Sequence, residues 1–97
     1  MSLETCMSSG LKTADTAIYA RPCKIHGIQL IPAAAASSVV VYDNASAASG
    51  TVTAKILAVA NGESVNYVPL APIECLNGIY ADVGGTDAAF IIHFSAM

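Results

Sequence analysis

From Ala17 onward, short apolar runs rich in β-branched residues alternate with brief interruptions of Gly, Asn, Asp or Pro. The interruptions recur about every eight to twelve residues, which is the spacing expected of a sandwich or barrel of short antiparallel strands. The pattern therefore predicts an all-β fold. We expect a single antiparallel β-sandwich, jelly-roll-like in arrangement, over residues 17–97, preceded by an extended N-terminal arm over residues 1–16.

The apolar runs between these interruptions are the predicted strands. Thr51–Ala60 contains several good helix formers, but its β-branched start and the Asn61-Gly62 turn that follows favour a strand. The last two runs, separated by Gly84–Asp87, give the strongest hairpin signal in the chain. The predicted strands are Ala17–Arg21, Cys23–Ile31, Val39–Asp43, Thr51–Ala60, Val65–Val68, Pro72–Leu76, Ile79–Val83 and Ala88–Phe94.

Residues 1–16 are mostly small and polar and show no apolar period. Such a segment gains little by folding back on its own sandwich, so we expect it to be disordered or docked on a partner. The first residues also lack the basic and apolar regions of a secretory signal. We therefore expect synthesis in a reducing cytosol.

The surface is short of charge. Charged residues make up 11% of the chain and hydrophobic residues 55%, whereas about 25% charged residues is typical of soluble domains. This composition predicts that part of the surface is covered in an assembly. The four basic residues are scattered and the net charge is −3, so we expect no nucleic-acid partner and no membrane partner.

The last predicted strand has two apolar faces. Phe90, Ile92 and Phe94 alternate with Ala89, Ile91 and His93, and alternate residues of a strand point to opposite faces of its sheet. A two-layer sandwich buries only one face of each sheet. The second face therefore needs a cover, which is the arm, a neighbouring subunit or a larger partner.

The three cysteines, Cys6, Cys23 and Cys75, are widely spaced and form no close pair. We interpret them as buried, reduced thiols. One alternative is a zinc site in which His26 or His93 completes the ligand set of the three cysteines. Another is a nucleophilic pair of Cys23 or Cys75 with His26 or His93. Structural zinc sites normally contain closely spaced ligand pairs, which this chain lacks. We expect no metal, no cofactor and no catalytic residues, and hence no enzyme.

The remaining polar candidates are acids and tyrosines. Asp82 and Asp87 flank Gly84-Gly85 and Glu63 follows Asn61-Gly62, so we interpret these three as turn acids. Asp43 and Asn44 open a loop and could bind a cation, but the spacing of a calcium-binding loop is absent. The tyrosines allow two interpretations, because aromatic rings serve both packing and sugar binding. They are Tyr19, Tyr42, Tyr67 and Tyr80.

The order of these elements resembles the small β-sandwich virion structural proteins of tailed bacteriophages, of the capsid cement or decoration type. The resemblance covers residues 17–95. It rests on the Tyr42-Asp43 pair followed by the small-residue loop 45–51, and on the run Asn77-Gly78-Ile79-Tyr80 before the final strands.

Such a relationship implies a homotrimer on the capsid surface that binds the major capsid protein and stabilises the phage head. The alternative is a head-fibre or tail component that binds a host-surface glycan. No catalytic residues accompany the family, so none are carried over.

Overall fold

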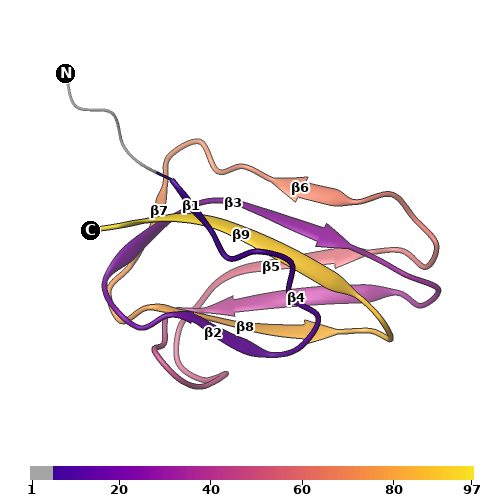
Figure 1. Cartoon of the computed structure of the whole chain (residues 1–97), viewed down its shortest axis with the longest axis horizontal. Helices are drawn as coiled ribbons and strands as arrows, with labels where there is room; N and C mark the ends of the chain where they lie inside the picture. The colour runs from indigo at the N-terminus through magenta and orange to yellow at the C-terminus, as the bar shows by residue number, and fades with distance from the viewer. Residues whose placement is uncertain (1–5) are drawn as a thin grey trace.

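The computed structural model describes residues 6–97, which form two antiparallel β-sheets packed face to face, with no helix in this range (Figure 1). Each of the eight predicted strand regions contains a strand, and Thr51–Ala60 is extended rather than helical. The strands are β1 (Met7–Ser8), β2 (Thr16–Tyr19), β3 (Cys23–Ile31), β4 (Ser37–Tyr42), β5 (Val52–Ala58), β6 (Val65–Tyr67), β7 (Ile73–Cys75), β8 (Ile79–Gly84) and β9 (Ala89–Ala96).

The chain changes sheet at most of its connections. The five-stranded sheet has the order β1-β9-β3-β6, and β7 also pairs with β3. The four-stranded sheet has the order β2-β8-β4-β5. β6 pairs with residues 28–30 of β3, and β7 with residues 23–25, so the two short strands follow each other along β3. Within residues 6–97, β4 and β5 are the only consecutive strands that pair with each other.

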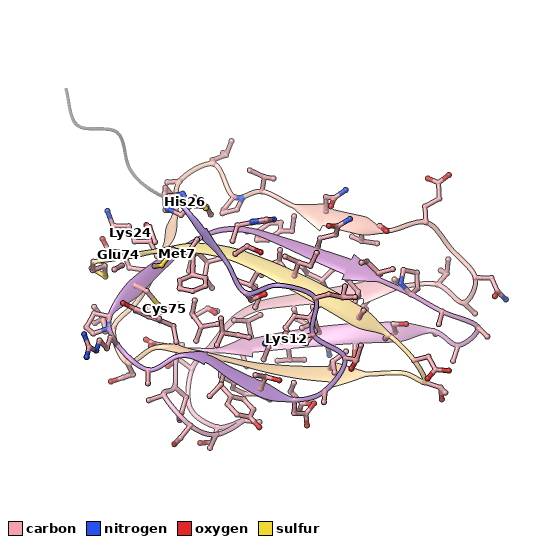
Figure 2. All side chains as sticks on the ribbon, viewed as in Figure 1. Met7, Lys12, Lys24, His26, Glu74 and Cys75 are labelled. Carbon is pink, nitrogen blue, oxygen red and sulfur yellow. The ribbon has the colours of Figure 1, made fainter. Side chains whose placement is uncertain are left out.

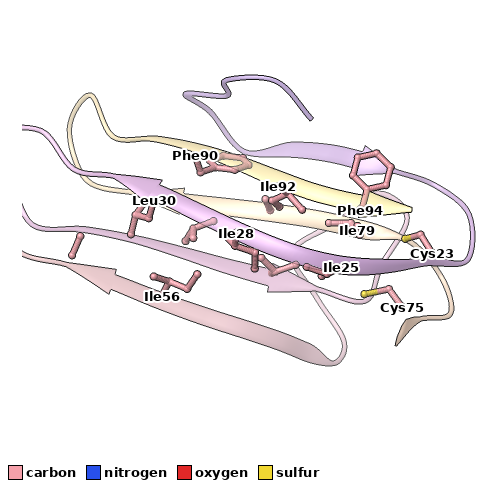
Figure 3. Close-up of a cluster of buried hydrophobic side chains, with 14 residues drawn as sticks. Cys23, Ile25, Ile28, Leu30, Ile56, Cys75, Ile79, Phe90, Ile92 and Phe94 are labelled. Atoms are coloured by element: carbon pink, nitrogen blue, oxygen red, sulfur yellow. The ribbon is translucent and has the colours of Figure 1, made fainter. Parts of the chain in front are cut away.

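The core lies between the two sheets and comes from alternate residues of their central strands (Figure 3). Phe90, Ile92 and Phe94 point inward from β9, as the alternation predicts. Each fully buried large side chain contributes about 1.5–3 kcal/mol through removal of its apolar surface from water. Other buried members of the core are Ile25, Ile28 and Leu30 on β3, Val39 and Val41 on β4, Ile56 on β5 and Ile79 on β8.

The predicted hairpin between the last two strands is wrong. β8 pairs with β2 and β4, whereas β9 pairs with β1 and β3, so the two strands lie in different sheets. Their apolar faces meet across the core instead of lying side by side. The chain turns at Gly85, whose φ of 103° favours glycine and whose added Cβ would lie 2.6 Å from the carbonyl oxygen of Ala36. A glycine-rich link therefore marks a corner between sheets here.

The segment before β2 lies along the chain's own sheet. Met7 pairs with Phe94, and Lys12 and Phe90 exchange two backbone hydrogen bonds of 2.9 Å. The expectation that residues 1–16 gain little by folding back is wrong for this part, because the edge of β9 offers backbone groups that the segment satisfies. Residues 1–5 of the expected arm lie outside the described residues.

Candidate interaction surface

Residues 6–97 contain no pocket and no group of three or more His, Cys, Asp or Glu side chains arranged to hold a metal ion. No helix in the same range has the length and apolar character that crossing a membrane requires. The candidate site is therefore sought on the outer faces of the two sheets, where the exposed side chains gather.

Two of the three cysteines lie on the inner side of the five-stranded sheet, whereas both histidines lie on its outer side. Cys23 and Cys75 are directly opposed on β3 and β7 and are fully buried in the core, as Figure 3 shows. Burial raises the pKa of the Cys23 thiol to about 12 and that of Cys75 to about 11. His26 and His93 are on the outer face, and Cys6 is exposed at the surface. The structure does not assemble the zinc or Cys–His alternatives from these residues.

The outer face of the five-stranded sheet is largely polar. Lys24 lies between Glu74 and Ser95 in register, and the Nε2 atom of His26 lies 2.7 Å from the Oγ atom of Ser95. Figure 2 shows Lys24, His26 and Glu74 gathered at one end of the molecule. On β9 itself this face carries Ala89, Ile91 and His93, but Gln29 of β3 lies in register beside Ile91, so the apolar character of the strand does not extend across the sheet.

The outer face of the four-stranded sheet is the more apolar of the two. Its centre is Val40, which lies in register between Asp82 on β8 and Lys55 on β5. Two further rows run across the strands on either side of this one. The first contains Gly84, Ser38 and Leu57, and the second contains Ala17, Tyr80, Tyr42 and Val52.

Several side chains of this face are open to solvent. Leu57 is 66% exposed and Val52 is 49% exposed, and Lys55 is exposed between them. Val40, Tyr42, Tyr80 and Asp82 are half-buried. The face therefore combines an apolar strip along β4 with one positive edge and one negative edge.

The negative edge contains two carboxylates. Asp15 Oδ1 accepts a hydrogen bond of 2.9 Å from the backbone N–H of Val83. The pKa of Asp82 is raised, first by burial and then by its hydrogen bond with Asp15 and the negative charge of Asp15. Lys55 lies two strands away, and within residues 6–97 no ion pair joins it to either acid.

The tyrosines divide between core and surface. Tyr19 packs against Phe94 with ring centroids 5.1 Å apart, and Tyr67 is exposed on β6. Tyr42 and Tyr80 are register partners on β4 and β8. Two of the four tyrosines therefore lie side by side on the outer face of the four-stranded sheet.

The interpretation of Asp82 as a turn acid is wrong, because Asp82 lies within β8 in register with Val40. Asp43, Asp87 and Glu63 lie in turns and loops. Asp43 accepts backbone hydrogen bonds from Leu76 at 3.2 Å and from Asn77 at 2.8 Å, which ties the loop after β4 to the turn before β8. Asp87 has a φ of 59° and lies in the link between β8 and β9. Glu63 is exposed after the Asn61-Gly62 turn. None of these three acids joins the pair formed by Asp15 and Asp82.

Sequence reasoning did not single out Asp15, Lys55 and Leu57 as surface residues that act together. The alternation of β5 places Leu57 and Lys55 on one face, and this signal was available in the sequence. The strand that carries Asp82 could not be placed beside them from the sequence, because β8 is distant in the chain from both of its partners, β2 and β4.

The chain was compared with family models, with curated proteins and with solved structures, and none of these matches it.

Proposed function

We propose that the protein is a structural virion protein of the tailed-phage type, a capsid cement or decoration protein. It binds the major capsid protein and stabilises the phage head from its outer surface. It is synthesised in the host cytoplasm and remains on the virion.

The observation that supports this proposal most is a charge-poor sandwich with a partly apolar outer face next to an open sheet edge. Among residues 6–97, β5 pairs with β4 alone, so within this range one side of the seven-residue strand is open to strand addition. Leu57 and Val52 are exposed on the same strand. Exposed apolar side chains beside an open edge are suited to lateral contacts with other proteins, and many weak contacts on one lattice raise avidity.

The finer description of the sandwich as jelly-roll-like is part of the proposal. Counting β6 and β7 as two parts of one strand gives two sheets of four strand positions each. Jelly rolls have eight strands in two sheets and occur in viral capsid and lectin domains. A fold alone does not establish function. The proposed homotrimer rests on the resemblance of the sequence to cement proteins.

Binding to capsids that lack the protein tests the proposal. The purified protein should sediment with such capsids and raise the temperature at which they rupture. Leu57→Ser should reduce binding, whereas Val68→Ser, which changes a residue that is 75% exposed on the loop after β6, serves as the matched control. A protein that neither sediments with capsids nor changes their rupture temperature contradicts the cement function.

The second candidate is a head-fibre or tail module that binds a host-surface glycan. The adjacent Tyr42 and Tyr80 favour it, because aromatic faces stack on sugar rings. Titration of glycans monitored by NMR should then shift the ring resonances of both tyrosines. Tyr42→Ala should abolish the shift of the Tyr80 ring, and tyrosine resonances that stay unchanged with every glycan would contradict this candidate.

A further inference from the structure

The outer face of the four-stranded sheet is complementary to itself. Lys55 and Asp82 flank Val40 from opposite sides, each one strand away from β4. Neighbouring strands are about 4.8 Å apart, so the two charged residues lie about 10 Å apart across the face. A face with opposite charges on its two sides can pair with a second copy that is turned over.

Side-chain size, like charge, differs between the two sides of β4. In the neighbouring row, Ser38 lies on β4 between Leu57 on one side and Gly84 on the other. Leu57 is the most exposed large hydrophobic side chain of β5, at 66%, whereas Gly84 has no side chain. A projecting side chain and a glycine, whose Cβ position lies 2.8 Å from the Ser38 Oγ atom, therefore lie on opposite sides of β4 at equal distances.

One twofold axis satisfies both rows. This axis runs along β4, between the two copies. It places β5 of each copy opposite β8 of the other copy. Each row of residues then faces the same row of the second copy. Lys55 then faces Asp82 of the second copy, and Leu57 faces Gly84. An axis across the strands would instead place Lys55 against Lys55, which like-charge repulsion disfavours.

We propose that two copies of this chain associate through the outer faces of their four-stranded sheets, related by a twofold axis along β4. Val40 and Tyr42 lie on the axis and meet their own counterparts, and the charged and apolar contacts on either side each occur twice. Such an isologous contact closes on itself and forms a dimer.

The inference does not depend on the protein being in a virion, because it rests on the register of the sheet. It is separate from the proposed homotrimer, because a ring of three uses two different contact surfaces on each subunit, whereas the twofold contact uses one surface that pairs with itself.

The area of the face sets the expected affinity. Four strands about 4.8 Å apart and about six residues long cover roughly 400 Å² on each copy. Stable dimers usually bury about 800 Å² on each partner, so this contact is weak by itself. We expect a dissociation constant in the micromolar to millimolar range, tightened where many copies are held side by side.

Charge exchange tests the arrangement. Sedimentation velocity over micromolar to millimolar concentrations should show a reversible monomer–dimer equilibrium. Lys55→Glu alone and Asp82→Lys alone should each weaken dimerisation by about tenfold or more, because each substitution creates two like-charge contacts. The double variant should recover an affinity close to that of the natural chain, because every contact again joins opposite charges.

A covalent test places the two residues directly. An equal mixture of ¹⁵N-labelled and unlabelled protein is treated with a carbodiimide, which joins a lysine amine to a carboxylate with loss of water. Cross-linked peptides should join Lys55 to Asp82 or to its neighbour Asp15. Because the two forms pair at random, about half of these products should combine one labelled and one unlabelled peptide. Leu57→Asp should remove these mixed peptides, and Leu70→Asp, on a fully exposed loop residue, should leave them.

Three results overturn the inference. They are a monomer at all concentrations, a trimer that is unaffected by Lys55→Glu, and a double variant no better than the single ones. A chain that stays monomeric yet loses capsid binding on Leu57→Ser assigns the face to the capsid protein. That result contradicts the twofold contact and leaves the proposed function standing.

Discussion

Gly78 is the position where the structure predicts the largest effect of adding a single methyl group. It follows Asn77 in the turn before β8, is buried, and has a φ of 137°. A Cβ atom there would lie 2.3 Å from the carbonyl oxygen of Tyr19 and 3.2 Å from the Cα atom of Ala20. Both contacts are to backbone atoms, so the crowding cannot be relieved by a rotamer change.

The expected cost of Gly78→Ala has two parts. The positive φ costs an L-residue about 1–2 kcal/mol. The overlap with the backbone of β2 adds about 1–3 kcal/mol, the usual range for overpacking a tight site. The sum, about 2–5 kcal/mol, is a large fraction of the 5–15 kcal/mol by which typical domains are stable.

Substitutions at two other glycines separate the cost of the positive φ from the cost of the steric overlap. Gly10 has a φ of 73° but no atom within 4 Å of its added Cβ, so Gly10→Ala should cost only the conformational part. Gly27 lies in β3 without a positive φ, and its nearest neighbour would be the carbonyl oxygen of Tyr67 at 3.5 Å. Gly27→Ala should therefore change stability by less than about 1 kcal/mol.

Urea denaturation followed by circular dichroism measures all three variants. We expect the midpoint for Gly78→Ala to fall most, that for Gly10→Ala to fall slightly and that for Gly27→Ala to stay near the natural value, with equal slopes. Equal midpoints for Gly78→Ala and Gly10→Ala would refute the close approach of the Asn77-Gly78 turn to β2.

Further predictions concern thiols, pH and metal. Cys6 should react at once with a thiol reagent at pH 8, whereas Cys23 and Cys75, which are buried and have raised pKa values, should react only on unfolding. Equal reaction rates for all three thiols would contradict the burial of Cys23 and Cys75. The raised pKa of Asp82 means that the folded state binds its proton more tightly than the unfolded state. Asp82→Asn should therefore be more stable than the natural chain at pH 7 in dilute solution, with the difference shrinking as the pH falls toward 4; a difference that is independent of pH would exclude the titration of Asp82 as its cause. A chelator should leave the thermal midpoint unchanged, and a fall in that midpoint would show a structural metal.

The sequence could predict which residues face the core because strand alternation is a local property. Phe90, Ile92 and Phe94 alternate with less buried residues, and the structure buries all three. The regions of the strands follow from the punctuation by Gly, Asn and Pro for the same reason. These features depend on neighbours within a few residues of the chain.

Strand partners depend on distant residues, and there the prediction was less successful. Gly84-Gly85 was interpreted as a hairpin turn, yet the corner that it forms sends β8 and β9 into different sheets. Local composition does not distinguish the two outcomes, because both need a tight glycine-rich link. The same limit applies to the surface, since the approach of Asp15 to Asp82 follows from the pairing of β2 with β8.

The part of the N-terminal segment that the structure describes shows a further limit. Residues 7–12 have little apolar character, but they satisfy backbone hydrogen bonds along β9. Side-chain composition alone does not report this contribution, because an open sheet edge accepts a strand through its backbone.

Electron cryo-microscopy of tailed-phage particles that contain this protein tests the central claim most directly. The proposed function predicts repeated density on the outer surface of the head, with a size and shape that fit the sandwich of residues 6–97 and with contacts to the major capsid protein. Density for this protein only in the tail or fibres, or its absence from the particles, would contradict the cement function.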